Sequence, residues 1–176
     1  MDRIFSIAPP FRVPDGTWVS PFLNAKDSES DLPFDLLDGF SLAAGMIEPN
    51  STSSIHIMPF VTQVTFVRSG RLTVKMKGPQ DTKPYQLNLE PEQAVLTEPN
   101  TYFQLINERQ EPCKVLYIVS PAYTFELSDS HVLYDDSVII DKDWHELEQA
   151  GWKPSRPLPT QAERNATLQR LAAQKT

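Results

Sequence analysis

Cysteine is almost absent from this 176-residue chain, and long apolar runs are absent altogether. Cys113 is the only cysteine, which excludes an internal disulfide and a cluster of thiolate ligands for a metal. No apolar run approaches the ~20 residues of a membrane-spanning helix. Pro9 and Pro10 interrupt the N-terminal segment before it could act as a signal sequence. We therefore expect a soluble, cytoplasmic protein without a membrane partner, with Cys113 in its core.

Basic residues are too few in the main part of the chain for binding to nucleic acid. Residues 1–152 carry 22 acids and 11 bases, a net charge of −11, whereas residues 153–176 carry one acid and five bases, a net charge of +4. The field of the acidic part repels phosphate, so we expect no nucleic-acid partner. Two fates of the basic tail stay open: contact with an acidic surface of its own chain or of a partner subunit, or extension into solvent.

Glycine is also scarce, with six residues, but 16 prolines separate short apolar runs at close intervals. This pattern is typical of an all-β sandwich or barrel, and the length suits a single hydrophobic core. The runs are rich in β-branched and aromatic residues. They predict strands at 17–23, 41–48, 54–58, 63–68, 71–77, 85–89, 94–98, 102–107, 114–119 and 138–140.

Two of these strands are predicted to form a hairpin. Residues 63–68 and 71–77 flank the two-residue link Ser69–Gly70, in which Gly70 would take a positive φ. Apolar and polar residues alternate in the second strand, so one of its faces should lie in the core and the other in water.

We divide the chain into four parts. Residues 1–40 are predicted to form an N-terminal arm that adds edge strands or crosses to a neighbouring subunit, and residues 41–120 the barrel core. Residues 121–152 should supply a closing strand and a helix, and residues 153–176 a basic helical tail.

Two short C-terminal helices have recognisable ends. The first, of about three turns, is predicted to begin after Asp141 as N-cap and to end at Gly151. The second begins at Thr160, and Glu163 three residues later completes a capping-box sequence.

The segment from Pro49 to Gly70, PNSTSSIHIMPFVTQVTFVRSG, has the spacing of a metal-binding β-barrel motif. It resembles the first signature of the cupin superfamily. There a Pro-Gly turn precedes two histidines one residue apart, a glutamate five residues later and a glycine seven residues after that. Those places hold His56, Met58, Gln63 and Gly70.

The second cupin signature is a Pro-x-Gly turn followed after two residues by a third histidine. In EPNTYFQLIN it falls on Pro99, Thr101 and Gln104. The resemblance covers residues 41–120 and implies an all-β, cupin-like double-stranded β-helix, or jelly roll, with one or two short C-terminal α-helices.

Only His56 remains of the four metal ligands that the resemblance implies. A typical member would hold Fe(II), Mn(II), Ni(II) or Zn(II) with three histidines and a carboxylate. Met58 offers a thioether, and Gln63 and Gln104 offer neutral carbonyl oxygens. We therefore expect no tightly bound metal and no cofactor. The alternative is a divalent metal held weakly by His56, Gln63 and Gln104.

The same positions suit a polar cluster in an apolar cavity that binds a small-molecule ligand. A metal-free enzyme is a further alternative, in which His56 would serve as general acid or base and Gln104 or Tyr102 would polarise a carbonyl. The alternation of strand residues predicts the remaining ligand-binding positions as Met58, Gln63, Thr65, Val67, Ile106 and Tyr117.

Three functions stay open, and enzymatic activity is undecided among them. The first is a barrel that binds a small organic ligand without a tightly bound metal. The second is a divergent metal-dependent oxygenase, isomerase or lyase acting on a small metabolite. The third is a non-catalytic assembly domain whose barrel is filled by its own side chains.

We predict that the chain forms a homodimer. Sedimentation at micromolar concentration should then give a mass near twice the 19.9 kDa of one chain. A monomer under those conditions would contradict the prediction.

Overall fold

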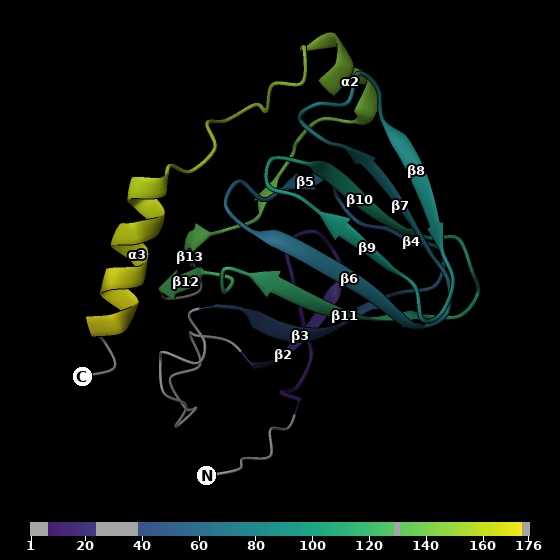
Figure 1. Ribbon diagram of the computed structural model, residues 1–176, viewed down its shortest axis with the longest axis horizontal. Coiled ribbons are helices and arrows are strands. Elements are labelled where there is room, and N and C mark those ends of the chain that lie inside the picture. Colours follow the sequence, from purple (N-terminus) through teal and green to yellow (C-terminus); the bar gives the residue numbers. More distant parts are fainter. Residues whose placement is uncertain (1–6, 24–38, 129–130, 174–176) are drawn as a thin grey trace.

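The computed structural model describes residues 7–23, 39–128 and 131–173, and two antiparallel six-stranded sheets face each other in it (Figure 1). The first sheet has the order β1-β2-β3-β11-β6-β9, with β1 (Phe11–Arg12), β2 (Trp18–Leu23), β3 (Ser41–Ile47), β11 (Cys113–Ser120), β6 (Thr62–Ser69) and β9 (Ala94–Thr97). The second has the order β14-β5-β10-β7-β8, with β14 (Val138–Ile139), β5 (His56–Ile57), β10 (Tyr102–Asn107), β7 (Leu72–Lys77) and β8 (Tyr85–Leu89), and β4 (Ser51–Thr52) also pairs with β10.

Three further elements lie outside these sheets. β12 (Phe125–Ser128) and β13 (His131–Asp135) pair only with each other among the described strands, and α2 (Trp144–Gln149) and α3 (Gln161–Ala173) follow. The prediction of an all-β sandwich with short C-terminal helices is confirmed. No helix in the described part of the chain is long and apolar enough to span a membrane.

The core lies between the two sheets and follows from the alternation of side chains along each strand. In β11 the residues Val115, Tyr117 and Val119 face inward, and in β10 Phe103 and Leu105 do so. Burial of one such side chain stabilises the fold by about 1.5–3 kcal/mol. Cys113 is buried, as expected.

The predicted hairpin around Ser69–Gly70 is wrong, although Gly70 has the expected positive φ of 80°. β6 pairs with β11 and β9, whereas β7 pairs with β10 and β8, so the link carries the chain from one sheet to the other. β7 buries the apolar residues Leu72, Val74 and Met76 from one wall of the core, whereas β6 buries a mixed face of Gln63, Thr65 and Val67 from the other. The turn was visible in the sequence, but the partners of the strands were not.

Four short strands were missed, namely β1, β4, β12 and β13. β1 and β4 have only two residues each, which is too short for alternation to show. β12 and β13 lie in an acidic segment that lacks a regular apolar pattern and pair with a shift in register.

The start of the first helix was predicted two residues too early. Asp143, not Asp141, is the N-cap: its carboxylate accepts a hydrogen bond from the Glu146 N–H at 2.8 Å, and the Glu146 carboxylate accepts one from the Asp143 N–H. α2 has six residues rather than three turns. Gly151, with a φ of 64°, follows its C-terminus as expected.

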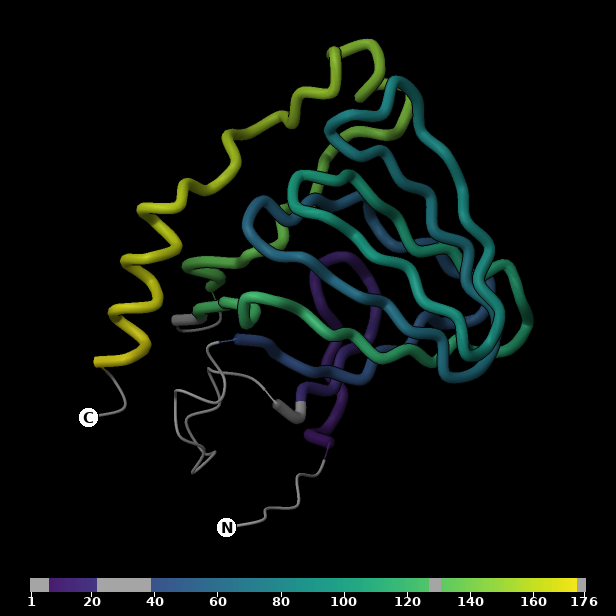
Figure 2. Tube along the Cα trace, viewed as in Figure 1, coloured from purple at the N-terminus to yellow at the C-terminus, as the bar shows by residue number. Residues whose placement is uncertain are grey.

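The second helix, α3, begins directly after Thr160, and the hydrogen bonds of the predicted Thr160–Glu163 capping box are present. An extended link joins it to α2, and it lies beside β12 and β13 (Figure 2). Arg164 contacts both carboxylate oxygens of the fully buried Asp136, at 2.9 and 3.1 Å. Arg170 pairs with Glu126 at 2.7 Å. The basic tail therefore contacts acidic residues of its own chain.

We predict that Arg164→Met lowers the free energy of unfolding by about 3–5 kcal/mol, because it leaves the Asp136 carboxylate buried without its cation. Arg71→Met is the matched control. It removes an ion pair to Glu90 in which both side chains are about half exposed, and it should cost at most about 1 kcal/mol.

Denaturant titration measures both variants, and proteolysis of the link before α3 tests whether the helix detaches first. Equal losses in the two variants would contradict a stabilising role for the buried pair.

Candidate functional site

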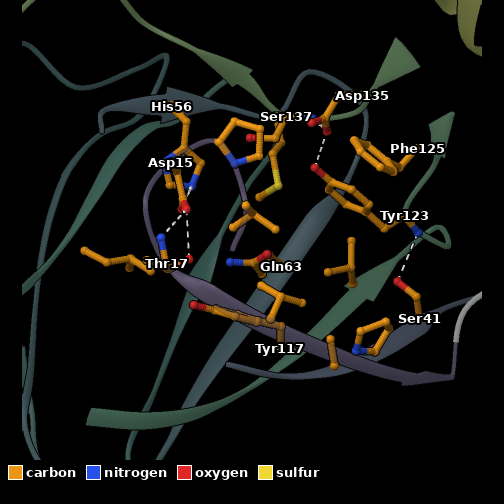
Figure 3. A pocket seen from close by; sticks show the side chains of 18 of the residues that line it. Asp15, Thr17, Ser41, His56, Gln63, Tyr117, Tyr123, Phe125, Asp135 and Ser137 are labelled. Atoms are coloured by element: carbon orange, nitrogen blue, oxygen red, sulfur yellow. Dashed lines mark hydrogen bonds and ion pairs between the residues drawn. The ribbon is translucent and has the colours of Figure 1, made fainter. Parts of the chain in front are cut away.

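A cavity of about 160 Å³ lies between the two sheets, near the end at which β12 and β13 leave the sandwich (Figure 3). Both sheets, the turn before β2 and the segment around β12 and β13 contribute to its wall. Most of the lining side chains are apolar. The lining residues are Phe11, Val13, Pro14, Asp15, Thr17, Val19, Pro21, Ser41, Leu42, Ala43, His56, Met58, Gln63, Leu105, Tyr117, Val119, Tyr123, Phe125, Asp135, Ser137 and Ile139.

His56 lies at one end of the cavity and is only 5 % exposed. Its Nδ1 is 3.0 Å from the Ser54 carbonyl oxygen, which can only accept, so we assign the proton of the neutral ring to Nδ1. The lone pair of Nε2 then faces the Asp15 carboxylate, whose Oδ2 is 3.9 Å away. Burial lowers the pKa of His56, and the nearby Asp15 charge and the Ser54 carbonyl only partly offset this effect.

Asp15 belongs to the turn that joins β1 to β2, where Gly16 has a φ of 95°. Its Oδ1 accepts hydrogen bonds from the Thr17 N–H at 2.9 Å and the Thr17 hydroxyl at 2.8 Å. Its backbone carbonyl accepts one from the Ser54 N–H at 2.8 Å, which holds the turn beside His56. Among the described residues, no hydrogen-bond donor reaches Asp15 Oδ2.

Gln63 and Tyr117 line the middle of the cavity (Figure 3). The Gln63 amide donates to the Thr65 hydroxyl at 3.1 Å. The Tyr117 ring lies over Gly45, where an added Cβ would be only 2.2 Å from the ring, so its position requires glycine there. The Tyr117 hydroxyl is buried beside Thr17, but no partner within the described residues meets the geometry of a hydrogen bond.

A second polar group lies at the opposite end of the cavity (Figure 3). The Tyr123 hydroxyl donates a short hydrogen bond to Asp135, and Asp135 also accepts from the Ser137 N–H at 2.8 Å. The Ser41 hydroxyl accepts from the Tyr123 N–H at 3.0 Å. Burial and the Asp135 charge raise the pKa of Tyr123 well above its usual value, so this phenol stays protonated as a donor.

Four of the predicted site residues line this cavity. They are His56, Met58, Gln63 and Tyr117, and their roles in binding or catalysis stay predictions. Thr65 and Val67 also point inward from β6, at 1 % and 0 % exposure, but they belong to the packed core and are not part of the cavity wall.

The predicted inward orientation of Tyr102, Gln104 and Ile106 is wrong. These residues lie on the outer face of β10, so neither the acid–base set nor the weak metal set that included Gln104 comes together. The Gln104 amide donates to the Ser53 carbonyl and accepts from the Trp144 indole N–H, each at 2.8 Å. The Tyr102 hydroxyl donates to the Trp152 carbonyl at 2.6 Å. Both therefore hold α2 and the segment after it against the sheet.

The second cupin signature was aligned with the sequence one residue too late. A shift of one residue exchanges the two faces of a strand. In the turn before β10, Asn100 and not Thr101 has the left-handed backbone, with a φ of 64°. Counted from this residue, the place of the third histidine falls on Phe103. The Phe103 ring lies 3.8 Å from the His56 ring, centroid to centroid, at an interplanar angle of 57°.

These inward side chains do not fit a divalent metal. Only the imidazole of His56 is a good ligand among them, because the other three groups are the Met58 thioether, the Gln63 amide and the Phe103 phenyl ring. The nearby Asp15 adds one carboxylate. Within the described residues, no three His, Cys, Asp or Glu side chains gather to hold an ion.

Sequence reasoning missed Asp15, Tyr123 and Asp135 in the cavity wall, and Phe103 behind it against His56. Pro14–Asp15–Gly16 carries a clear turn signal, but nothing in it indicates that the turn packs against His56. For Phe103 an informative signal existed, because asparagine accepts a positive φ more readily than threonine does.

Comparison with known proteins defines the fold. No family model and no curated protein sequence matches the chain. Among solved structures, the CENP-C cupin domain of Drosophila melanogaster matches with a TM-score of 0.51 and 14 % identity over 64 % of this chain and 70 % of that one. Oxalate decarboxylase of Lactobacillus farciminis matches with a TM-score of 0.56 and 14 % identity, over 75 % of this chain but only 33 % of that one. A recombinant oxalate oxidase matches with a TM-score of 0.53 and 20 % identity, over 65 % and 55 %.

These likenesses show that the chain has the cupin fold, as the two signatures implied. They do not assign an activity, because one fold carries many functions.

We predict that acidification destabilises the wild type more than a His56→Asn variant. The pKa of folded His56 lies below its ordinary value of 6.5, so the unfolded chain binds a proton in a pH range where the folded chain does not. Stability from neutral His56 is complete above pH 6.5 and falls below it, by up to about 1.4 kcal/mol per pH unit.

Denaturant unfolding from pH 7.5 to 5.5 measures this difference. The exposed His145→Asn is the control and should follow the wild type. The prediction would be contradicted if the difference in the free energy of unfolding between wild type and His56→Asn stayed constant across this pH range.

Proposed function

We propose that this cupin-fold barrel binds a small organic ligand in the cavity between its sheets, without a tightly bound metal. The observation that carries the proposal is an apolar cavity lined by polar side chains whose hydrogen-bonding capacity the described chain leaves unfilled. The Tyr117 hydroxyl is buried without a hydrogen-bond partner among the described residues, and Nε2 of His56 lies 3.9 Å from Asp15 Oδ2, too far for a hydrogen bond. Buried polar groups are normally paired, so a ligand that pairs them gains affinity.

The volume limits the size of the ligand. A cavity of about 150 Å³ in another protein is large enough for benzene. The present cavity, at about 160 Å³, therefore suits a molecule of about six to eight non-hydrogen atoms. Such a space also argues against the assembly alternative, in which side chains fill the barrel completely.

A second candidate is a metal-free enzyme in which His56 transfers a proton to or from the bound ligand. The favouring observation is the 3.9 Å distance between His56 Nε2 and Asp15 Oδ2, two side chains that belong to residues of the cavity wall. A carboxylate beside an imidazole stabilises its protonated form, as proton transfer requires. The metal-dependent alternative has less support, because the inward donors suit a divalent ion poorly.

A thermal-shift screen with small metabolites tests binding. A ligand at 100 times its dissociation constant should stabilise the protein by about 2.7 kcal/mol. Ala43→Leu, which places a larger side chain in the cavity, should abolish the shift. Ala44→Leu, next to it on β3 but outside the cavity wall, should retain it.

The proposal fails if no compound shifts the wild type, or if Ala43→Leu responds as the wild type does. Elemental analysis of protein purified without an affinity tag tests the metal. A near-stoichiometric transition metal that is lost in His56→Ala would contradict the metal-free site.

A further inference from the structure

We propose that the ligand is a small primary amine bound as its ammonium ion. Its nitrogen lies between Asp15 and His56, and its apolar part lies in the cavity. This inference rests on the proposed function and specifies the ligand class.

The first argument is the pairing of two acceptors. With the Nδ1 proton donated to Ser54, Nε2 of His56 can only accept, and so can Oδ2 of Asp15. The two atoms are 3.9 Å apart, too far for a hydrogen bond, and neither carries a proton to share. A nitrogen about 2.9 Å from each would donate to both. An ammonium group has three such donors, whereas an alcohol has one and a carboxylate has none.

The second argument is charge. The residues that line the cavity include two carboxylates, Asp15 and Asp135, and no lysine or arginine. The side chain of Asp15 is only 11 % exposed, and the described chain supplies no cation for it other than a protonated His56. A buried carboxylate is unfavourable without a counter-charge, and an ammonium ion supplies one. A negatively charged ligand would meet repulsion from both carboxylates.

The third argument is the neutral state of His56. Burial lowers its pKa, so at pH 7.5 the imidazole is uncharged and leaves the Asp15 charge unneutralised. The titratable groups that line the same cavity are Asp15, Tyr117, Tyr123 and Asp135, and none of them carries a positive charge. The cation must therefore come from the ligand.

The remaining wall suits a short hydrocarbon. Val19, Met58, Leu105 and Val119 line the cavity with apolar surface, and the Tyr117 ring can contact the ammonium through its π face. A five-membered ring with one amino group has six non-hydrogen atoms, which fits the volume.

The test uses three probes of matched shape: cyclopentylamine, cyclopentanol and cyclopentanecarboxylate. Their affinities for the full chain are measured by calorimetry at pH 7.5 in the presence of a chelator. We expect the amine to bind at least about tenfold more tightly than the alcohol, because hydrogen bonds to charged groups are the stronger ones, and the carboxylate to bind most weakly.

Asp15→Asn should lower the affinity for the amine by about tenfold or more and change the affinity for the alcohol much less. Glu108→Gln removes one exposed carboxylate outside the cavity wall and should leave the amine affinity unchanged. His56→Leu, which removes the second acceptor, should also weaken the amine. The ratio of amine to alcohol affinity in the wild type does not depend on whether any variant folds.

Alcohol or carboxylate binding as tight as that of the amine would overturn the inference but leave the proposed cavity function standing. Failure of all three probes, while other metabolites shift the melting temperature, would likewise overturn only the inference. Failure of every compound would overturn both.

Discussion

The contact between the rings of Phe103 and His56 is the interaction on which the rest of the site depends. Phe103 is fully buried and lies on β10 opposite His56 of β5 on one side and Met76 of β7 on the other. Its ring packs against the imidazole at a tilt of 57° and limits the ring positions of His56. Nδ1 therefore meets the Ser54 carbonyl, and Nε2 meets Asp15.

The alternation of side chains along β10 also decides which residues lie outside the barrel. Because Phe103 points inward, Tyr102 and Gln104 point outward, where their polar ends bind the segment from Trp144 to Trp152. An aromatic cluster covers that face: the Trp152 ring lies 6.2 Å from Tyr102 and 6.5 Å from Trp144. β10 thus supplies Leu105 to the cavity wall and Phe103 beside His56, and it also holds α2, so a change of its register would disrupt both.

The sequence allowed the fold and half of the site to be predicted, and the physical reason for the division is clear. Local signals were sufficient for most of the described strands, for Gly70 and for the capping box at Thr160, because propensity, turn chemistry and alternation act over a few residues. The spacing of the first signature placed His56, Met58 and Gln63 correctly. The second signature was placed one residue too late, because the glycine place was given to Thr101. Asn100 tolerates a positive φ better and occupies that place in the structure.

Non-local contacts lay beyond such reasoning. Asp15 is 41 positions from His56, and only the closure of the sandwich brings the turn before β2 to β5. The pairing of β6 with β11 and β9 likewise joins segments that are far apart in the sequence. A single sequence shows that a strand has an apolar face but not which strand lies beside it.

The buried ion pair of the tail extends this dependence to the far end of the cavity. Arg164 of α3 binds Asp136 and also donates to the Ala122 carbonyl at 2.8 Å. Asp136 directly follows Asp135 in the chain, and Ala122 directly precedes Tyr123. The hydrogen bond between Tyr123 and Asp135 belongs to the end of the cavity opposite His56. Asp136 in turn accepts from the Thr124 N–H at 2.7 Å, so the two chain segments are joined on both sides of the Tyr123–Asp135 contact. Because the site needs both segments in register, the basic tail stabilises the cavity from outside without contributing a positive charge to its lining.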